Sequence, residues 1–186
     1  DRPVQPAQPP SVVNLASIQE RKGTDLFVET AIQVCQRHPT VEFIWLGHGE
    51  RFGSWQSKIE RAGLQDRILF PGYVDAGHLI LRRASLLFLS SRDDPFPLAV
   101  LEAMYLGRTI VTFDVGGAPE ALAGEGYIIP PFDTDAAASA ILDSLDKSPE
   151  QRIIPKLRER YLAEFTPRVF AERLSRCLRE KLTNDD

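Results

Sequence analysis

The stretch SLLFLSSRDDPFPLAVLEAMYLGRTIVTF, residues 85–113, decides the fold. It begins with a short, continuously apolar run over 85–90 and ends with a second one over 109–113, and each run is typical of a buried strand. Between them, 98–106 is apolar at nearly every position, and Gly107 follows as a stop signal for a helix. The pattern predicts a strand–helix–strand unit, in which the loop after the first strand lies at the carboxyl edge of a parallel sheet.

One carboxylate, Glu102, interrupts the apolar segment over 98–106. Because this segment predicts a helix that is buried nearly all round, a charged group on it needs a partner. We therefore expect Glu102 to accept hydrogen bonds, either from protein groups or from the hydroxyls of a ligand. Pro95 and Pro97 indicate a rigid loop that leads into the first helical turn, and Asp94 in this loop could face the same crevice as Glu102.

The same alternation of apolar strands with helices runs along the rest of the chain. We expect strands over 12–18, 41–47, 67–70, 85–90, 109–113 and 126–129. We expect helices from Thr24, as a possible cap, until Pro39, and over 50–63, 75–83, 98–106, 134–145, 149–165 and 166–182, with a short helix opened by the glycine-rich turn at 114–120. These elements predict an α/β domain with a three-layer, doubly wound, Rossmann-like parallel sheet covered on both faces.

Composition sets limits on the function. The 186 residues suit one domain, and 43% hydrophobic residues are enough for a core. The net charge of −4 argues against a nucleic acid partner, which usually demands a basic face. No apolar stretch approaches the roughly 20 residues that span a bilayer. Four prolines in 1–10 indicate a linker or domain boundary, which leaves 11–186 as the folded domain.

Metal and cofactor chemistry has little support. Cys35 and Cys177 lie far apart in the sequence, so we expect reduced thiols. The histidines, His38, His48 and His78, lack the spacing of metal ligands. We expect neither a metal nor a cofactor.

Taken in order, five segments resemble the C-terminal, donor-binding domain of retaining glycosyltransferases of the GT-B fold, family 4 group. These segments are 21–25, 46–49, 70–74, 94–102 and 114–120, and the resemblance extends over about 12–182. Each segment is unspecific by itself, whereas their order and spacing together are specific. The resemblance implies that the chain is the C-terminal half of a GT-B enzyme, with an N-terminal acceptor-binding domain outside this sequence.

The resemblance also implies roles for charged residues. As catalytic residues, Lys22 would neutralise the diphosphate of a nucleotide sugar, and Asp94 would contact the donor sugar at a position where the family commonly has Glu. Glu102 would bind the ribose hydroxyls, and Arg21 is a possible second phosphate ligand. For Lys22, Asp94 and Glu102, the structural alternatives are a solvated lysine, a loop or cap aspartate and a buried ion pair, respectively.

Further donor-binding positions follow from the same resemblance. Backbone groups of 96–99 would face the sugar and diphosphate, a turn of small residues would lie beneath the nucleotide, and an aromatic edge would contact the base. The residues concerned are Phe96, Pro97, Leu98, Ala99, Gly47, Gly49, Tyr73 and Val74. Pro97 has no amide hydrogen, so Leu98 and Ala99 are the better donors. An ordinary hydrophobic edge would also explain Tyr73 and Val74, and Gly116 and Gly117 are better explained by a turn and a helix start.

One position departs from the family pattern. The family usually places an arginine six residues before the lysine, and Ala16 stands there. Alanine cannot make the bidentate phosphate contact of an arginine. This departure and Asp94 motivate an alternative function, a catalytically degenerate nucleotide-sugar-binding or protein-interaction module. A nucleotide-sugar epimerase ranks last, because these residues offer no clear acid and base pair.

The leading hypothesis is a hexosyltransferase-like enzyme half that binds an NDP-sugar donor and transfers its glycosyl group, with retention and without a metal, to an unidentified acceptor. We expect this domain to bind donor but scarcely to transfer without the acceptor domain. We expect a cytoplasmic protein, because we expect reduced thiols and because nucleotide sugars are cytoplasmic donors, and peripheral attachment of the full-length protein to a membrane stays open.

Overall fold

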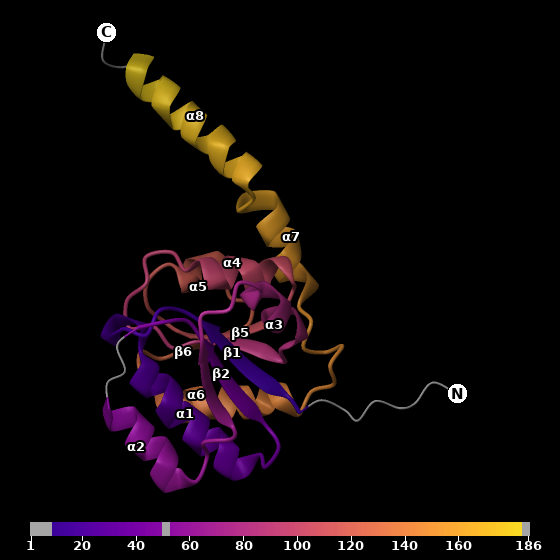
Figure 1. Ribbon diagram of the computed structural model, residues 1–186. Coiled ribbons are helices and arrows are strands. Elements are labelled where there is room, and N and C mark those ends of the chain that lie inside the picture. The colour runs from indigo at the N-terminus through magenta and orange to yellow at the C-terminus, as the bar shows by residue number, and fades with distance from the viewer. Residues whose placement is uncertain (1–8, 50–52, 184–186) are drawn as a thin grey trace.

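The computed structural model describes residues 9–49 and 53–183. Within this part of the chain, six parallel strands form one sheet in the order β3-β2-β1-β4-β5-β6 (Figure 1). The strands are β1 (Ser11–Leu15), β2 (Glu42–Leu46), β3 (Ile68–Gly72), β4 (Leu86–Leu89), β5 (Thr109–Phe113) and β6 (Tyr127–Ile129). The chain runs outward from β1 to β3 and then returns to place β4 beside β1. The order therefore reverses between β1 and β4, and such switch points leave a crevice at the carboxyl ends of the two strands.

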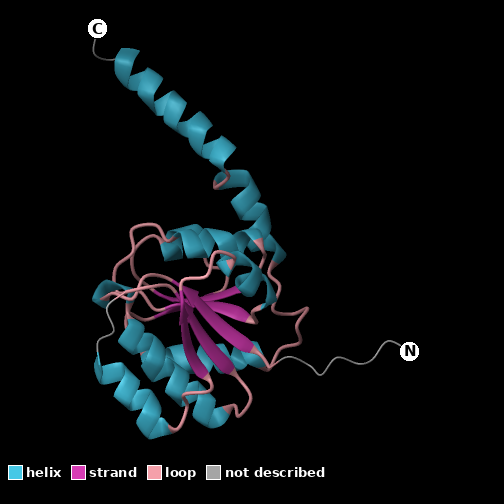
Figure 2. Ribbon diagram, in the orientation of Figure 1, coloured by secondary structure: helices cyan, strands magenta, loops and turns pink. Residues whose placement is uncertain are grey.

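Helices connect the strands and cover both faces of the sheet (Figure 2). They are the 3₁₀ helix η1 (Glu20–Lys22), α1 (Thr24–Arg37), α2 (Gly53–Ala62), α3 (Gly77–Arg83), α4 (Leu98–Tyr105), α5 (Ala118–Leu122), α6 (Thr134–Leu145), α7 (Pro155–Glu164) and α8 (Pro167–Thr183). Helices α1, α2 and α6 share one core with the sheet, and α4, α5 and α7 share another on the opposite face. The predicted three-layer, doubly wound domain is confirmed.

The two cores explain why β4 is apolar at every position. Successive side chains of a strand point to opposite faces of the sheet. In β4, Leu86 and Phe88 join the core beneath α1, whereas Leu87 and Leu89 join the core beneath α4. Phe27 of α1 anchors the first core, with its ring 5.9 Å from that of Phe88. Because β4 is buried on both sides, apolar side chains are favoured at all of its positions, and this produces the continuous apolar run.

The last helix extends away from the sheet. Helix α8 leaves the body of the domain after α7 (Figure 1), and its apolar residues Phe170, Leu174 and Leu178 are exposed. Its start agrees with the prediction, because the Val169 amide donates to the Thr166 hydroxyl at 3.3 Å and Pro167 is the first helical residue. None of the helices in the described ranges has the length and apolar composition to cross a membrane.

The structure corrects several predicted boundaries and one burial prediction. Gly23, rather than Thr24, is the N-cap of α1, and α7 begins at Pro155 rather than at 149. Helix α4 is not buried all round, because one face of it is open to solvent at Leu98, Glu102 and Tyr105, with Leu98 71% exposed. Residues 1–8 of the linker proposed over 1–10, and the helix start over 50–52, lie outside the described residues.

Candidate functional site

Two loops meet at the carboxyl ends of β1 and β4, where the strand order reverses. The first, between β1 and α1, carries Lys22, and the second, between β4 and α4, carries Asp94. The amides of Arg92 and Asp93 both donate to the carbonyl of Arg21, at 2.8 and 3.2 Å. Gly23 has a φ of +67°, and a Cβ atom there would lie 2.0 Å from the carbonyl oxygen of Ser90. The loops therefore touch through their backbones, and glycine is required at the contact.

Lys22 and Asp94 form an ion pair at these strand ends. The Lys22 ammonium donates to the Asp94 carboxylate, and the two side chains are only 13% and 11% exposed. Lys22 is therefore not a solvated lysine of a connection. Two charges with little access to water attract each other strongly, but each depends on the other for stability. The structure thus brings together the two residues that the sequence proposes as catalytic.

Polar contacts beneath the pair fix the loop backbones. The Asn14 side-chain amide, on β1, donates to the hydroxyl of Ser90 at 3.3 Å, and this hydroxyl donates to the carbonyl of Lys22 at 3.2 Å. Asn14 and Ser90 are fully buried. A buried network of this kind holds the loop that carries Lys22 in register with β4.

The loop between β5 and α5 supports Asp94 from another side. The Gly117 amide donates to the Asp94 carbonyl at 3.1 Å. Gly116 has a φ of +61°, and a Cβ atom there would lie 2.1 Å from the same oxygen. Helix α5 begins at Ala118, so the prediction of a turn and a helix start at these glycines is confirmed.

Arg21 and Ala16 occupy different environments in the first loop. The Arg21 side chain is exposed and donates to the Gln19 side chain at 3.0 Å, so its guanidinium can also meet an anion in solution. Ala16 is held by backbone contacts: its carbonyl accepts from the Trp45 indole at 2.8 Å, and its amide donates to the Leu46 carbonyl at 3.0 Å. Ala16 itself therefore has no side-chain group that could bind a phosphate, unlike the arginine that the family usually has at this position.

The glycines after β2 are explained by the packing of the chain itself. A Cβ atom on Gly47 would lie 2.0 Å from the Ala16 carbonyl oxygen, and one on Gly49 would lie 2.0 Å from that of Ile18. Tyr73 is exposed, with its ring 5.9 Å from that of His48. Tyr73 is thus available to a ligand at the carboxyl edge of β2 and β3.

Val74 and Ala99 belong to cores. Half-buried Val74 packs against the small cluster that contains Val13 and Leu46, and buried Ala99 belongs to the core beneath α4. The side chain of Ala99 is thus taken up by the core, and its backbone is the part that could face a ligand. The amides of Leu98 and Ala99 remain candidates, because the first amides of a helix precede its own hydrogen-bond ladder, and Pro97 at the N-cap has no amide hydrogen.

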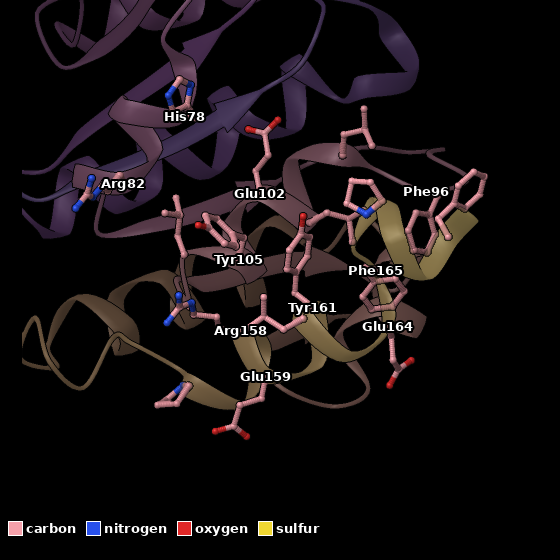
Figure 3. Close-up of a pocket in the computed structure, with 18 of the residues that line it drawn as sticks. His78, Arg82, Phe96, Glu102, Tyr105, Arg158, Glu159, Tyr161, Glu164 and Phe165 are labelled. Carbon is pink, nitrogen blue, oxygen red and sulfur yellow. The ribbon is translucent and has the colours of Figure 1, made fainter. Parts of the chain in front are cut away.

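Glu102 lies in a groove of about 1530 Å³ between α3, α4, α7 and the start of α8 (Figure 3). Phe96 and Leu98 also line this groove, whereas Lys22 and Asp94 do not. The Glu102 side chain extends from α4 toward the side on which His78 lies. Partial burial raises the pKa of the Glu102 carboxyl, and the charge of His78 lowers it to a smaller extent.

Glu102 therefore departs from the expected enclosed carboxylate. The residue is exposed, and within the described residues no hydrogen bond or ion pair holds its carboxylate. Of the two expected kinds of partner, protein groups are not found among the described residues, since the helix face that carries the carboxylate is open, and the hydroxyls of a ligand stay a prediction. Its acceptors are available to a ligand.

Sequence reasoning missed two residues, Arg92 and Asp25, that connect the β4–α4 loop to the segment around Lys22. The Arg92 guanidinium donates two hydrogen bonds to the Asp25 carboxylate, at 2.7 and 2.6 Å. The two residues lie 67 positions apart in the sequence, so no local pattern pairs them.

No group of three or more His, Cys, Asp or Glu side chains within the described ranges could hold a metal ion.

Comparison with known proteins identifies the family. The sequence model of the family described as "Glycosyl transferases group 1" matches residues 9–147. The chain belongs to this family. Its Rossmann-like fold is that of one half of GT-B glycosyltransferases.

Particular relatives agree with this membership in the group 1 glycosyltransferases. The chain is 32% identical to a phosphatidylinositol N-acetylglucosaminyltransferase component of Arabidopsis thaliana over 133 residues, which cover 70% of this chain and 30% of that protein. It is 27% identical to the alpha-D-kanosaminyltransferase of Streptomyces kanamyceticus over 162 residues, which cover 85% of this chain and 40% of that enzyme. The chain thus spans less than half the length of these curated relatives.

Solved structures share the fold. Anabaena HepE in complex with UDP superposes with a TM-score of 0.83 at 21% identity, over 94% of this chain and 50% of that one. The C-terminal domain of the group 1 glycosyltransferase LpcC from Francisella tularensis superposes with a TM-score of 0.73 at 21% identity, over 86% of this chain and 88% of that domain. These two likenesses show that the described chain shares their fold.

Proposed function

We propose that this chain is the donor-binding half of a retaining glycosyltransferase that transfers a glycosyl group from a nucleotide sugar. The observation that carries the proposal is the Lys22–Asp94 pair, with side chains only 13% and 11% exposed, at the switch point between β1 and β4. Parallel α/β sheets bind ligands in this crevice. A partly buried cation there is suited to a diphosphate, and a carboxylate beside it is suited to sugar hydroxyls.

The proposed mechanism uses charges that the chain itself supplies. When the bond between the sugar and the diphosphate breaks, negative charge develops on the departing phosphate. Lys22, the exposed guanidinium of Arg21 and the first amides of α4 would stabilise this charge, so the reaction would proceed without a metal ion. Glu102 would accept hydrogen bonds from the ribose hydroxyls, and its lack of protein partners within the described chain supports this role.

The Lys22–Asp94 pair has a consequence for binding. In the free protein, Asp94 neutralises the ammonium that the diphosphate needs. The proposal therefore predicts that Asp94→Asn increases the affinity for the sugar-free diphosphate several-fold, because a negative charge beside the phosphates is removed. The same substitution should abolish any preference for the nucleotide sugar over the nucleotide.

Other parts of the proposal concern the whole protein. The curated relatives extend well beyond this chain, and an acceptor-binding domain in the remaining part would complete the enzyme. This domain should bind donor and scarcely transfer by itself. We place the enzyme in the cytoplasm, where nucleotide sugars are available, with peripheral attachment to a membrane.

Calorimetric titration with UDP, GDP and ADP tests the proposal. We expect one nucleotide to bind selectively and both Lys22→Ala and Glu102→Gln to weaken that binding at least about tenfold, as expected for lost charge-assisted hydrogen bonds. Lys58→Ala, which removes an exposed lysine of the Lys58–Glu29 pair, is the control and should bind like the wild type. Failure of the wild type to bind any of the three at millimolar concentration would favour the degenerate binding or interaction module.

A further inference from the structure

We propose that Arg92 is a positioning residue that holds the Asp94 loop against the Lys22 loop, and that Asp25 and Phe132 fix its guanidinium. The inference rests on the proposed donor site and adds residues to it. Arg92 touches neither of the proposed catalytic side chains by a hydrogen bond; it acts on the backbone that carries them.

Arg92 contacts both sides of Lys22 along the chain. Its guanidinium donates to the carbonyl of Glu20 at 3.1 Å and, through two nitrogens, to the carboxylate of Asp25. Its own amide donates to the Arg21 carbonyl at 2.8 Å. One residue in the β4–α4 loop thus binds the residues at 20, 21 and 25, which bracket Lys22 in η1 and at the start of α1.

Phe132 supports the guanidinium from the β6–α6 loop. Its ring lies 5.9 Å from the Arg92 guanidinium carbon and 6.0 Å from the ring of Phe113, in an edge-to-face arrangement. Phe132 has a φ of +64°, a conformation that costs free energy for any residue other than glycine. We infer that the contacts of the Phe132 side chain offset this backbone strain, and these contacts include the Arg92 guanidinium.

The geometry distinguishes this pair from an ordinary surface ion pair. The Arg92 and Asp25 side chains are 31% and 49% exposed, and single exposed pairs contribute little to stability. The bidentate arrangement, however, fixes the orientation of the planar guanidinium, which lysine cannot reproduce. The pair therefore supplies position more than stability, and its effect should appear in the loop and in ligand binding rather than in global unfolding.

Amide hydrogen exchange tests the clamp without a ligand. In Arg92→Gln, the amides of residues 92 and 93 should exchange at least about tenfold faster than in the wild type, relative to the core amide of Val111. Arg67→Gln is the matched control, because Arg67 also binds backbone carbonyls, those of Cys35, His38 and Val41, at the opposite edge of the sheet. Unchanged relative exchange at 92 and 93 in Arg92→Gln would overturn the proposal.

Titration with UDP, GDP and ADP then tests the effect on the site. Arg92→Gln should lose at least about tenfold in affinity for the nucleotide that the wild type binds, under conditions where it and Arg67→Gln are fully folded. Asp25→Asn should reproduce the loss, and the double variant should lose no more, while Arg67→Gln binds like the wild type. Equal affinity of Arg92→Gln and wild type would overturn the positioning role. If the wild type binds no nucleotide, the proposed function fails, and hydrogen exchange decides the clamp separately.

Discussion

The two acidic residues of the 94–102 segment lie in opposite environments. Asp94, in the crevice, is buried and paired with Lys22, and its loop is held by Gly117 and by contacts to Arg21. Glu102, eight residues later on α4, is exposed in the groove and has no hydrogen-bond partner among the described residues. The chain completes the first environment by itself and leaves the second open.

The difference means that Asp94 is preorganised by its protein partners, whereas Glu102 is available to a ligand. A paired charge in a fixed loop is already oriented for a ligand but must exchange partners to bind it, whereas an open carboxylate binds without that exchange. Substitutions in the crevice should therefore affect stability and binding together. Substitutions at Glu102 should affect binding with little cost in stability.

The largest expected effect is at Lys22. Lys22→Ala leaves the buried Asp94 carboxylate without its partner, so we expect a loss of about 3 kcal/mol in the free energy of unfolding. Lys58→Ala, in an exposed pair, should lose about 0.5 kcal/mol or less. Urea unfolding measures both. The double variant Lys22→Ala/Asp94→Asn should recover part of the loss, and no recovery would show that the buried charge is not its cause.

The next largest effect is expected at Gly116. Comparison with Gly63 separates the cost of the backbone conformation from the cost of the contact with the Asp94 carbonyl. Gly116→Ala brings a Cβ atom against the Asp94 carbonyl in a backbone conformation that disfavours side chains, and we expect a loss of at least about 2 kcal/mol. Gly63 has a similar φ, +67°, but open space around it, so Gly63→Ala should lose only about 1 kcal/mol. Urea unfolding of both variants gives the difference. Equal losses would mean that the β5–α5 loop does not brace Asp94.

Glu102→Gln should move binding and stability in different directions. Because burial raises the pKa of Glu102, its ionised form is disfavoured in the folded state, and the stability linked to this group declines as the pH rises through that pKa. At neutral pH the amide should keep or slightly increase the melting temperature, while nucleotide affinity falls at least about tenfold. A clear drop in melting temperature would show a structural partner for Glu102.

The smallest effect concerns acid stability. The Arg92 hydrogen bonds lower the pKa of Asp25, so the pair stabilises the fold above the unfolded pKa of roughly 4 and loses this contribution as the pH falls through the lower folded value. With the Asp25 side chain about half exposed, we expect less than about 1 kcal/mol. Unfolding free energies measured near neutral pH and in acid should show this acid-dependent part in the wild type and not in Asp25→Asn.

Much of the fold could be predicted because its signals are local. The apolar run of β5 and the helical spacing of α6 predict the observed bounds of both elements, and the Thr166–Pro167 pair predicts the start of α8. The alternation of these elements with others predicts the parallel, doubly wound sheet.

The arrangement of the site depends on distant pairs, which local patterns do not encode. Seventy-two positions separate Lys22 from Asp94, and sixty-seven separate Arg92 from Asp25. The apolar composition of α4 suggests burial all round. In the structure, however, Leu98 and Tyr105 of this helix line an open groove, which composition alone does not show. The sequence could name the two residues of the ion pair, but not their contact.

Amide chemical shifts can map where a nucleotide binds and so test for a donor site beside the Lys22–Asp94 pair. On titration with UDP, GDP or ADP, the account predicts saturable shifts at Gly23, Leu98 and Ala99, at the carboxyl edge of the sheet, and none at Gly63 and Arg67, which precede β3 at the opposite edge. Shifts confined to the opposite edge, or no shifts at millimolar nucleotide, would contradict a donor site between the Lys22 and Asp94 loops.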